Sequence, residues 1–218
     1  MGFWAGVLLL VALPLSGPLG MVLVSAVAPQ PPWTDAATFM RHYHPLQALP
    51  FLFGFVLLLA FPALQVALHL RARPAAQPFT LLGVVFAAVF AALIAFNYIA
   101  QTALVPAAVA RGDGALVALF SMNSPTAICW AIEMFGYGFL GVASLCALPA
   151  LPGPGLERVS RILLALNGVI SVLGAALTAR DARWVLTPAG LVAFLAWNVV
   201  ILAMVLALVL TLRGRARS

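Results

Sequence analysis

Residues Thr126–Leu148, TAICWAIEMFGYGFLGVASLCAL, decide how the chain folds. They form an apolar run of the length that crosses a bilayer as one helix, since about 20 residues span the roughly 30 Å of hydrocarbon. One carboxylate, Glu133, lies in the first half of this run. An ionisable side chain inside a membrane span indicates a functional site by default. The other polar side chains at the depth of Glu133 are therefore the first candidates to share that site.

The composition excludes a water-soluble domain. Of the 218 residues, 65% are hydrophobic and 7% are charged, with a mean hydropathy of +1.14, whereas soluble domains carry about 25% charged residues. All basic residues other than histidine are Arg, which excludes lysine chemistry. They are spread over several loops instead of forming the single basic face of a nucleic-acid-binding protein, so we expect no nucleic-acid partner.

The apolar runs predict an all-α polytopic transmembrane bundle, with residues 1–218 as a single integral membrane domain. Six spanning helices are expected, together with short interfacial helices. The expected spans are approximately 3–28, 49–70, 79–105, 126–148, 160–179 and 189–212. The first run imitates a signal peptide at Ala26–Ala28, but it is long and lacks a basic leading segment, so we interpret it as a span. Pro14, Gly17 and Pro18 predict a kink or a local break within it.

The connections between spans carry four further predictions. Asp35 is expected to begin a short interfacial helix, and Ala115–Ser124 is expected to form a surface-lying or re-entrant helix. Ser124 is expected to cap the fourth span, with Pro125 at the first helical position. His42 and His44 lack a third ligand, so we predict no metal and no other cofactor.

The arginines predict that both termini lie in the cytoplasm. With six spans they divide seven to four between the two sides, and the larger group is Arg71, Arg73, Arg158, Arg161, Arg213, Arg215 and Arg217. The smaller group is Arg41, Arg111, Arg180 and Arg183. Because cytoplasmic loops carry an excess of basic residues, the larger group marks the cytoplasmic side. We expect an integral protein of the bacterial inner membrane, in contact with membrane lipids.

Counting from the predicted helix ends places three polar side chains in one layer of the outer half of the bilayer. At about 1.5 Å per residue, Glu133 lies roughly 10 Å below the end of its helix, Asn97 roughly 12 Å and Asn198 roughly 14 Å. Glu133 shares a helix face with Trp130 and Tyr137. We expect Glu133 to be protonated or hydrogen-bonded to donors, since no Arg lies at its depth. The remaining candidate site residues are Tyr98, Gln101, Asn123 and Trp197.

These residues leave three functions open. The favoured hypothesis is a binding protein or carrier that holds a small hydrophobic or lipid-like molecule in a pocket centred on Glu133. The second is an intramembrane enzyme in which Glu133 is a catalytic general acid acting on an isoprenoid- or lipid-like substrate, although a second carboxylate, a metal motif and a nucleophile are missing. The third is a structural or assembly subunit without a ligand. Interhelical polar contacts contribute only about 0.6 kcal/mol on average, which favours a functional acid over a purely structural one.

Residues Gly136–Gly141, GYGFLG, match the GxGxxG pattern of dinucleotide-binding folds. That pattern binds a dinucleotide only where it follows a strand and opens a helix of a βαβ unit. Here it lies inside an apolar run with no strand before it. It indicates instead a thin helix surface on which a neighbouring helix or a lipid-like ligand approaches closely.

Three strings of the sequence resemble those of small six-helix integral membrane proteins of bacteria, a group that is uncharacterised. They are Asn97-Tyr98 with Gln101, LFSMNSP at 119–125, and EMFGYGFLG at 133–141. The likeness covers about half of the chain. The resemblance implies the fold and the membrane location, and it implies no activity.

Overall fold

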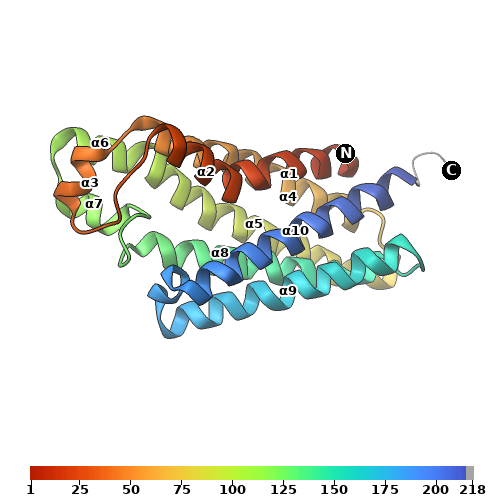
Figure 1. Ribbon diagram of the computed structural model, residues 1–218. Helices are drawn as coiled ribbons and strands as arrows, with labels where there is room; N and C mark the ends of the chain where they lie inside the picture. The colour runs from red at the N-terminus through yellow and green to blue at the C-terminus, as the bar shows by residue number, and fades with distance from the viewer. Residues whose placement is uncertain (215–218) are drawn as a thin grey trace.

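The computed structural model describes residues 1–214, which are helical throughout except for short connections and contain no strand. Arg215 and Arg217, which contributed to the predicted topology, lie outside the described residues. The chain begins at the end of the bundle where α10 (Pro188–Gly214) finishes (Figure 1). We call this end the terminal end. The opposite end, which carries α3 (Ala36–His42), α6 (Val105–Arg111) and α7 (Gly114–Phe120), is the cap end.

Five helices within residues 1–214 are long and apolar enough to cross a membrane, and a bent helix pair raises the number to six if it is counted as one span. The bent pair is α1 (Gly2–Ser16) with α2 (Pro18–Val27). The others are α4 (Leu49–His69), α5 (Gln77–Ile99), α8 (Ile128–Cys146), α9 (Leu156–Arg180) and α10. The predicted all-α polytopic bundle is confirmed.

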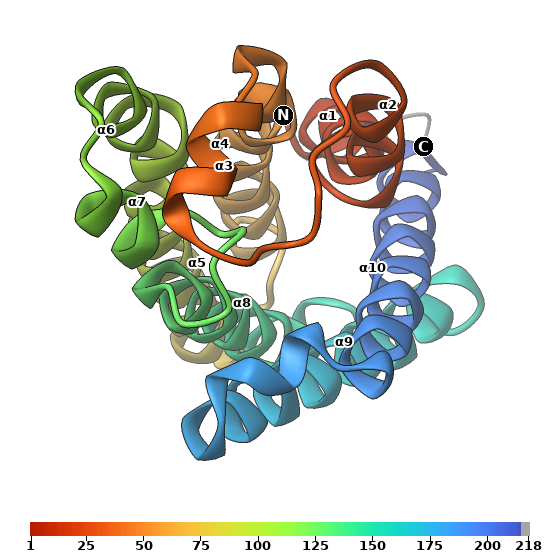
Figure 2. The same ribbon diagram turned by 60° about the vertical axis from the view of Figure 1, so that its left-hand side comes forward.

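The spans form a ring in chain order. α1 packs on α4, α4 on α5, α5 on α8, α8 on α9, α9 on α10, and α10 returns to α1. Figure 2 shows this arrangement, with α1 and α10 on one side and α5 and α8 on the other. Side chains from helices that are not neighbours therefore meet only where they reach across the ring.

The predicted break in the first span lies at Gly17. α1 ends at Ser16, Pro18 opens α2, and the two helices are bent by 43°. A proline is accepted at the first helical position because its missing N–H has no intrahelical partner there. A Cβ atom on residue 17 would lie 3.0 Å from Oδ1 of Asn198. The glycine therefore allows α10 to lie close against the bend.

The third span continues beyond its predicted end at Val105. α5 passes through a π-helical turn, Ala100–Leu104, into α6. In a regular helix the ring of Pro106 would clash with the carbonyl of Thr102, which lies within the widened π turn. With the preceding turn, the helical segment has 38 residues, about 57 Å at helical rise against roughly 30 Å of hydrocarbon. The predicted end of the third span at Val105, directly before Pro106, was therefore wrong.

The cap end has a small apolar cluster of its own. Phe39 from α3, Val105 and Ala108 from α6, and Val117 from α7 are buried against one another. The predicted helix start at Asp35 is confirmed, since its carboxylate accepts a 2.7 Å hydrogen bond from the Thr38 backbone N–H. α3 lies between α2 and α4, whereas α6 and α7 both lie between α5 and α8. Their packing places a folded cap over the ends of α4, α5 and α8.

The fourth span begins later than predicted and without the predicted cap. Residues 121–127 are non-helical, and α8 begins at Ile128 with Ala127 as N-cap and no side-chain cap bond. The Ser124 hydroxyl lies 3.4 Å from the Thr126 hydroxyl instead of capping the helix. Proline disfavours helical geometry at the residue before it, which here is Ser124, and the chain turns before the helix starts.

The fifth span begins earlier than predicted, at Leu156 instead of Ser160. Gly155 adopts φ 62°, a left-handed conformation that favours glycine, and reverses the chain directly before the helix. Glu157 in the first turn accepts a 2.7 Å hydrogen bond from the Gly153 N–H. An acidic residue suits a helix start because the unpaired N–H groups there carry partial positive charge.

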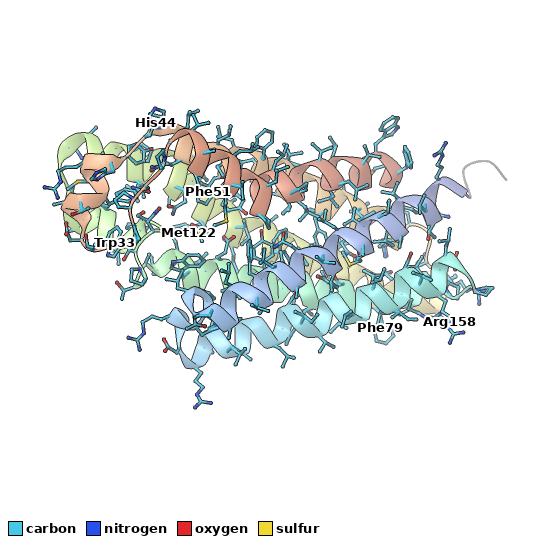
Figure 3. The ribbon with its side chains drawn as sticks, viewed as in Figure 1. Trp33, His44, Phe51, Phe79, Met122 and Arg158 are labelled. Atoms are coloured by element: carbon cyan, nitrogen blue, oxygen red, sulfur yellow. The ribbon has the colours of Figure 1, made fainter. Side chains whose placement is uncertain are left out.

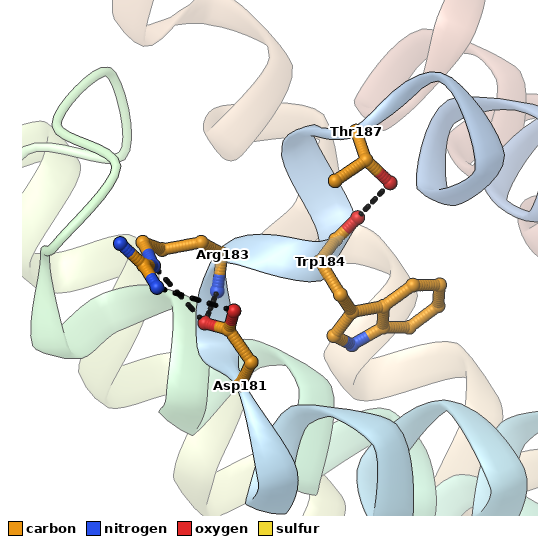
Figure 4. Close-up of polar contacts among 4 residues, drawn as sticks. All are labelled: Asp181, Arg183, Trp184 and Thr187. Atoms are coloured by element: carbon orange, nitrogen blue, oxygen red, sulfur yellow. Dashed lines mark hydrogen bonds and ion pairs between the residues drawn. The ribbon is translucent and has the colours of Figure 1, made fainter.

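The connection from α9 to α10 is ordered by local polar contacts (Figure 4). Arg183 donates to the Asp181 carboxylate, with an ion-pair distance of 3.1 Å. The neighbouring guanidinium lowers the pKa of Asp181 from its ordinary value. Thr187 donates to the Trp184 carbonyl, and the Trp184 indole N–H donates to the Thr178 hydroxyl at 2.8 Å.

The GYGFLG segment is a helix-packing surface. A Cβ atom on Gly138 would lie 2.8 Å from Cβ of Ala175, and one on Gly141 would lie 2.8 Å from the Gly168 carbonyl oxygen. Both neighbours belong to α9. The prediction that another helix approaches closely at these glycines is confirmed.

Candidate functional site

Glu133 in α8 is joined directly to Asn97 in α5. The Asn97 side-chain Nδ2 donates a hydrogen bond of 2.5 Å to Oε2 of Glu133 and also lies 3.1 Å from the Met122 sulfur. Asn97 is 0% exposed. The structure thus brings together two of the three polar side chains that were expected in one layer.

Gln101 extends this contact toward the cap end. It lies one helical turn beyond Asn97, in the π turn, and its Nε2 donates both to Oδ1 of Asn97 at 3.1 Å and to the Phe120 carbonyl at 2.8 Å. Its Oε1 accepts from the Met122 N–H at 3.1 Å. Gln101 therefore ties the connection before α8 to α5, and a continuous polar chain runs from that connection to Glu133.

The carboxyl group of Glu133 is held on one side only. Oε2 accepts from Asn97, whereas no hydrogen bond or ion pair within residues 1–214 reaches Oε1. Oε1 has no hydrogen-bond partner in the described part of the chain but is not completely buried, and the side chain as a whole is half-buried. The second oxygen therefore lies at an accessible surface inside the membrane span.

Aromatic rings surround this part of the bundle. The Tyr98 and Tyr137 hydroxyls lie 3.2 Å apart, and the Tyr137 ring meets the Trp197 ring edge-on with centroids 4.9 Å apart. Tyr137 and Trp197 belong to α8 and α10, which are not neighbours in the ring, so this contact crosses its interior. Both side chains are half-buried, while Tyr98 is buried.

Trp130 shares the helix face of Glu133, as its spacing predicted. The side chain is half-buried, but its indole Nε1 is buried and has no hydrogen-bond partner. Most buried donors in proteins are paired, so this N–H is an exception, and it lies on the same face of α8 as Glu133.

Two predicted site residues do not reach Glu133. Asn198 donates to the Phe194 carbonyl of its own helix at 2.9 Å, and its Oδ1 faces Gly17. Asn123 is exposed and donates to Oε1 of Gln30 at 2.9 Å, which joins two cap-end connections. Counting residues from a helix end gives depth but not the direction in which a side chain points.

Some neighbours of the site were not predicted. Met122 contacts Asn97 from the connection before α8, and Cys129, 0% exposed, lies one turn before Glu133 on α8. Figure 3 shows Met122 and Phe51 toward the cap end, away from Phe79 and Arg158. The i−4 spacing of Cys129 from Glu133 could have placed it near the site from the sequence. The position of Met122 could not be predicted in this way, because it depends on how the connection before α8 folds.

A small cavity of about 20 Å³, enough for one water molecule, approaches the polar chain from the cap end. Gln101 forms part of its wall, and the Gln47 Oε1 atom is buried there without a hydrogen-bond partner. The lining residues are Phe39, Tyr43, Gln47, Ala48, Phe51, Gln101, Val105, Ser121 and Asn123.

Residues 1–214 contain no group of three or more His, Cys, Asp or Glu side chains that would hold a metal ion. His42 contacts the Thr38 carbonyl, and His44 accepts from the Leu46 N–H. Both histidines thus contribute to local turns in the cap.

No protein family, curated protein or solved structure matches this chain. The resemblance to bacterial six-helix membrane proteins stays a prediction, and the functional argument rests on the geometry of the Glu133 site.

Proposed function

We propose that this integral membrane protein binds or carries a small hydrophobic or lipid-like molecule, with Glu133 as its polar anchor. The observation that supports the proposal is the one-sided hydrogen bonding of the carboxyl group, with Oε2 fixed by Asn97 and Oε1 unpaired and accessible. Because Asn97 fixes the orientation of the carboxyl group, binding a ligand at Oε1 requires little further ordering of the side chain.

The surroundings of Glu133 suit an amphiphilic ligand. Small-molecule sites are mostly apolar and carry a few polar groups that fix orientation. Trp130, Tyr137 and Trp197 are half-buried aromatic residues, while Glu133 Oε1 is available as an acceptor. A ligand with an apolar body and a polar head that bears a donor fits these groups.

A structural role is the second candidate, and the polar chain favours it. Asn97 and Gln101 connect α8, α5 and the connection that contains Met122. In that role the carboxyl group only joins helices, and a glutamine at position 133 would accept from Asn97 equally well. The two candidate functions therefore predict different effects of changing Glu133. In the first, a bound molecule is lost, and in the second, only the stability of the protein changes.

We also propose that the membrane is the bacterial inner membrane, with both termini in the cytoplasm. The described arginines support this orientation. Arg71 and Arg73 follow α4 at the terminal end, Arg158 and Arg161 lie in the first two turns of α9, and α10 ends at Arg213 and Gly214. Those at the cap end are Arg41, Arg111, Arg180 and Arg183. In this orientation the Glu133 site lies in the half of the bilayer away from the cytoplasm.

Native mass spectrometry of gently purified protein tests the ligand proposal. We expect a stoichiometric bound molecule in the unchanged protein and its loss in Glu133→Ala. Asn198→Ala is the matched control, because Asn198 was predicted at a similar depth but bonds only within its own helix. Equal retention in Glu133→Ala, or bulk phospholipid alone in every variant, overturns the proposal and favours the structural role. Turnover of the molecule that is lost in Glu133→Gln while binding persists would indicate the enzyme hypothesis instead.

A further inference from the structure

We infer that the ligand of the Glu133 site is a lipophilic cation, an amine or quaternary ammonium group on an apolar body. The inference rests on the proposed function and specifies the chemical class of its ligand. Three features carry it: the charge balance around the carboxyl group, its free oxygen, and the aromatic surface beside it.

The first feature is that Glu133 has no cationic partner within residues 1–214. The Arg183–Asp181 ion pair lies in the connection from α9 to α10, and no Arg or His forms an ion pair with Glu133. The groups close to Glu133 are polar but uncharged partners or weak acids: Asn97 on α5, and Cys129 and Tyr137 on α8. A carboxylate removed from water is costly unless it is paired. A cationic ligand supplies the charge that the protein itself does not.

The second feature is the direction in which the carboxyl group is presented. Asn97 holds Oε2, and Gln101 in turn holds Asn97, so the hydrogen bonds of the polar chain leave Oε1 free. An ammonium head that approaches Oε1 does not have to break any of these bonds. A protonated amine can also donate a charge-assisted hydrogen bond to this oxygen, which is stronger than the hydrogen bond of an alcohol. A quaternary ammonium group has no N–H and would be attracted to the carboxylate by its charge alone.

The third feature is aromatic surface around a site for positive charge. Trp130 and Tyr137 lie one turn before and after Glu133 on the same face, and Trp197 lies against Tyr137. All three residues are half-buried, so each keeps some exposed surface. Tryptophan and tyrosine rings attract cations, and aromatic groups are the usual recognition elements for quaternary ammonium ligands.

A matched pair of probes tests the inference. Benzyltrimethylammonium and neopentylbenzene have the same shape, but only the first carries a charge. Equilibrium dialysis against the purified, detergent-solubilised protein measures the affinity for each. We expect the cation to bind at least about tenfold more tightly than the neutral probe, and Glu133→Gln to remove this preference while leaving the affinity for neopentylbenzene unchanged.

Three further variants test the role of the aromatic ring and control for a change in folding. Tyr137→Phe keeps the aromatic ring and should retain the cation preference, whereas Tyr137→Leu should reduce it several-fold. Glu133→Gln keeps the acceptor for Asn97, and its thermal unfolding should match that of the unchanged protein. Asn198→Ala should bind both probes as the unchanged protein does.

The outcomes distinguish this inference from the proposed function. Equal affinity for the two probes, or a cation preference that persists in Glu133→Gln, overturns the cationic class. If a natural bound molecule still disappears in Glu133→Ala, the proposed function stands with a neutral ligand. Failure of both probes to bind overturns the inference as well, and the native mass spectra of the same preparations then decide the proposed function separately.

Discussion

The two halves of the bundle are built in different ways. Toward the terminal end, apolar side chains such as Leu64, Leu68 and Leu208 are buried in the core. Polar side chains are buried there as well, among them Ser144 and Asn167, which are joined by a hydrogen bond. Toward the cap end, Glu133 keeps an accessible oxygen among half-buried aromatic rings. Close packing restricts motion and leaves no room for a ligand. We therefore assign stability to the terminal half of the helices and the proposed binding site to the cap half.

This division predicts the largest effect in the terminal half. Leu64→Ala removes a side chain that is 1% exposed, and we expect it to lower the free energy of unfolding by about 2–5 kcal/mol because a cavity remains. Leu59→Ala on the same helix is the matched control, since Leu59 is 77% exposed and should change stability by less than about 0.5 kcal/mol. Unfolding in mixed micelles titrated with SDS, followed by circular dichroism, measures both. Similar losses in the two variants would contradict the assignment of stability to the buried leucines.

A smaller effect is expected at the polar contact. In a double-mutant cycle, Asn97→Ala and Glu133→Ala should couple by about 0.6 kcal/mol and by no more than about 1.7 kcal/mol, the range for polar contacts between membrane helices. The same cycle with Asn198→Ala should be additive within about 0.5 kcal/mol, because Asn198 does not contact Glu133. The SDS titration gives both coupling energies. Coupling of equal size in the two cycles would show that the coupling energy does not come from the hydrogen bond between Asn97 and Glu133.

The smallest effect is expected in the cap. Hydrogen bonds from Thr38, first from its backbone, lower the pKa of Asp35 below 3.8. The charged Asp35 therefore stabilises the start of α3 above this pH, and the stabilisation is lost as the pH falls through the lowered pKa. At pH 3 and below, backbone hydrogen exchange in residues 35–42 should become faster relative to that at pH 6, after correction for intrinsic rates. Asp35→Asn keeps a capping oxygen without the charge and should remove this pH dependence. A pH response that is unchanged in Asp35→Asn would exclude this carboxylate as its source.

The spans were predictable because a membrane helix is encoded by a continuous apolar run. The ends of the spans were harder to predict. The extension of α5 into α6 was missed because Pro106 resembles a terminator, and only the π turn before it shows how the proline is accommodated. The start of α8 was misplaced because Ser124-Pro125 is a cap signal by local rules. In the first case the widened turn accommodates the proline, and in the second the proline keeps Ser124 out of helical geometry.

The Glu133 site was predictable in part. The i+4 spacing of Asn97 and Gln101 placed the two amides on one helix face, and the structure links them by a hydrogen bond. The polar contact between Asn97 and Glu133 joins helices whose depths were comparable from the sequence. Asn198 had a similar depth but points back to its own helix, because its rotation about the helix axis depends on the packing of α10 against α1 and α9. A count of residues carries no such information.

The order of helices around the ring has a consequence for biogenesis. Each span packs on the one that precedes it in the chain, so during synthesis a newly inserted helix finds its partner already in the bilayer. The exception is the contact of α1 with α10, where a Cβ atom on Gly6 would overlap the Val209 side chain. This contact forms only when the last span arrives. Until then the face of α1 that carries Gly6 has no α10 to pack against. Assembly is complete when the first and the last span come into contact.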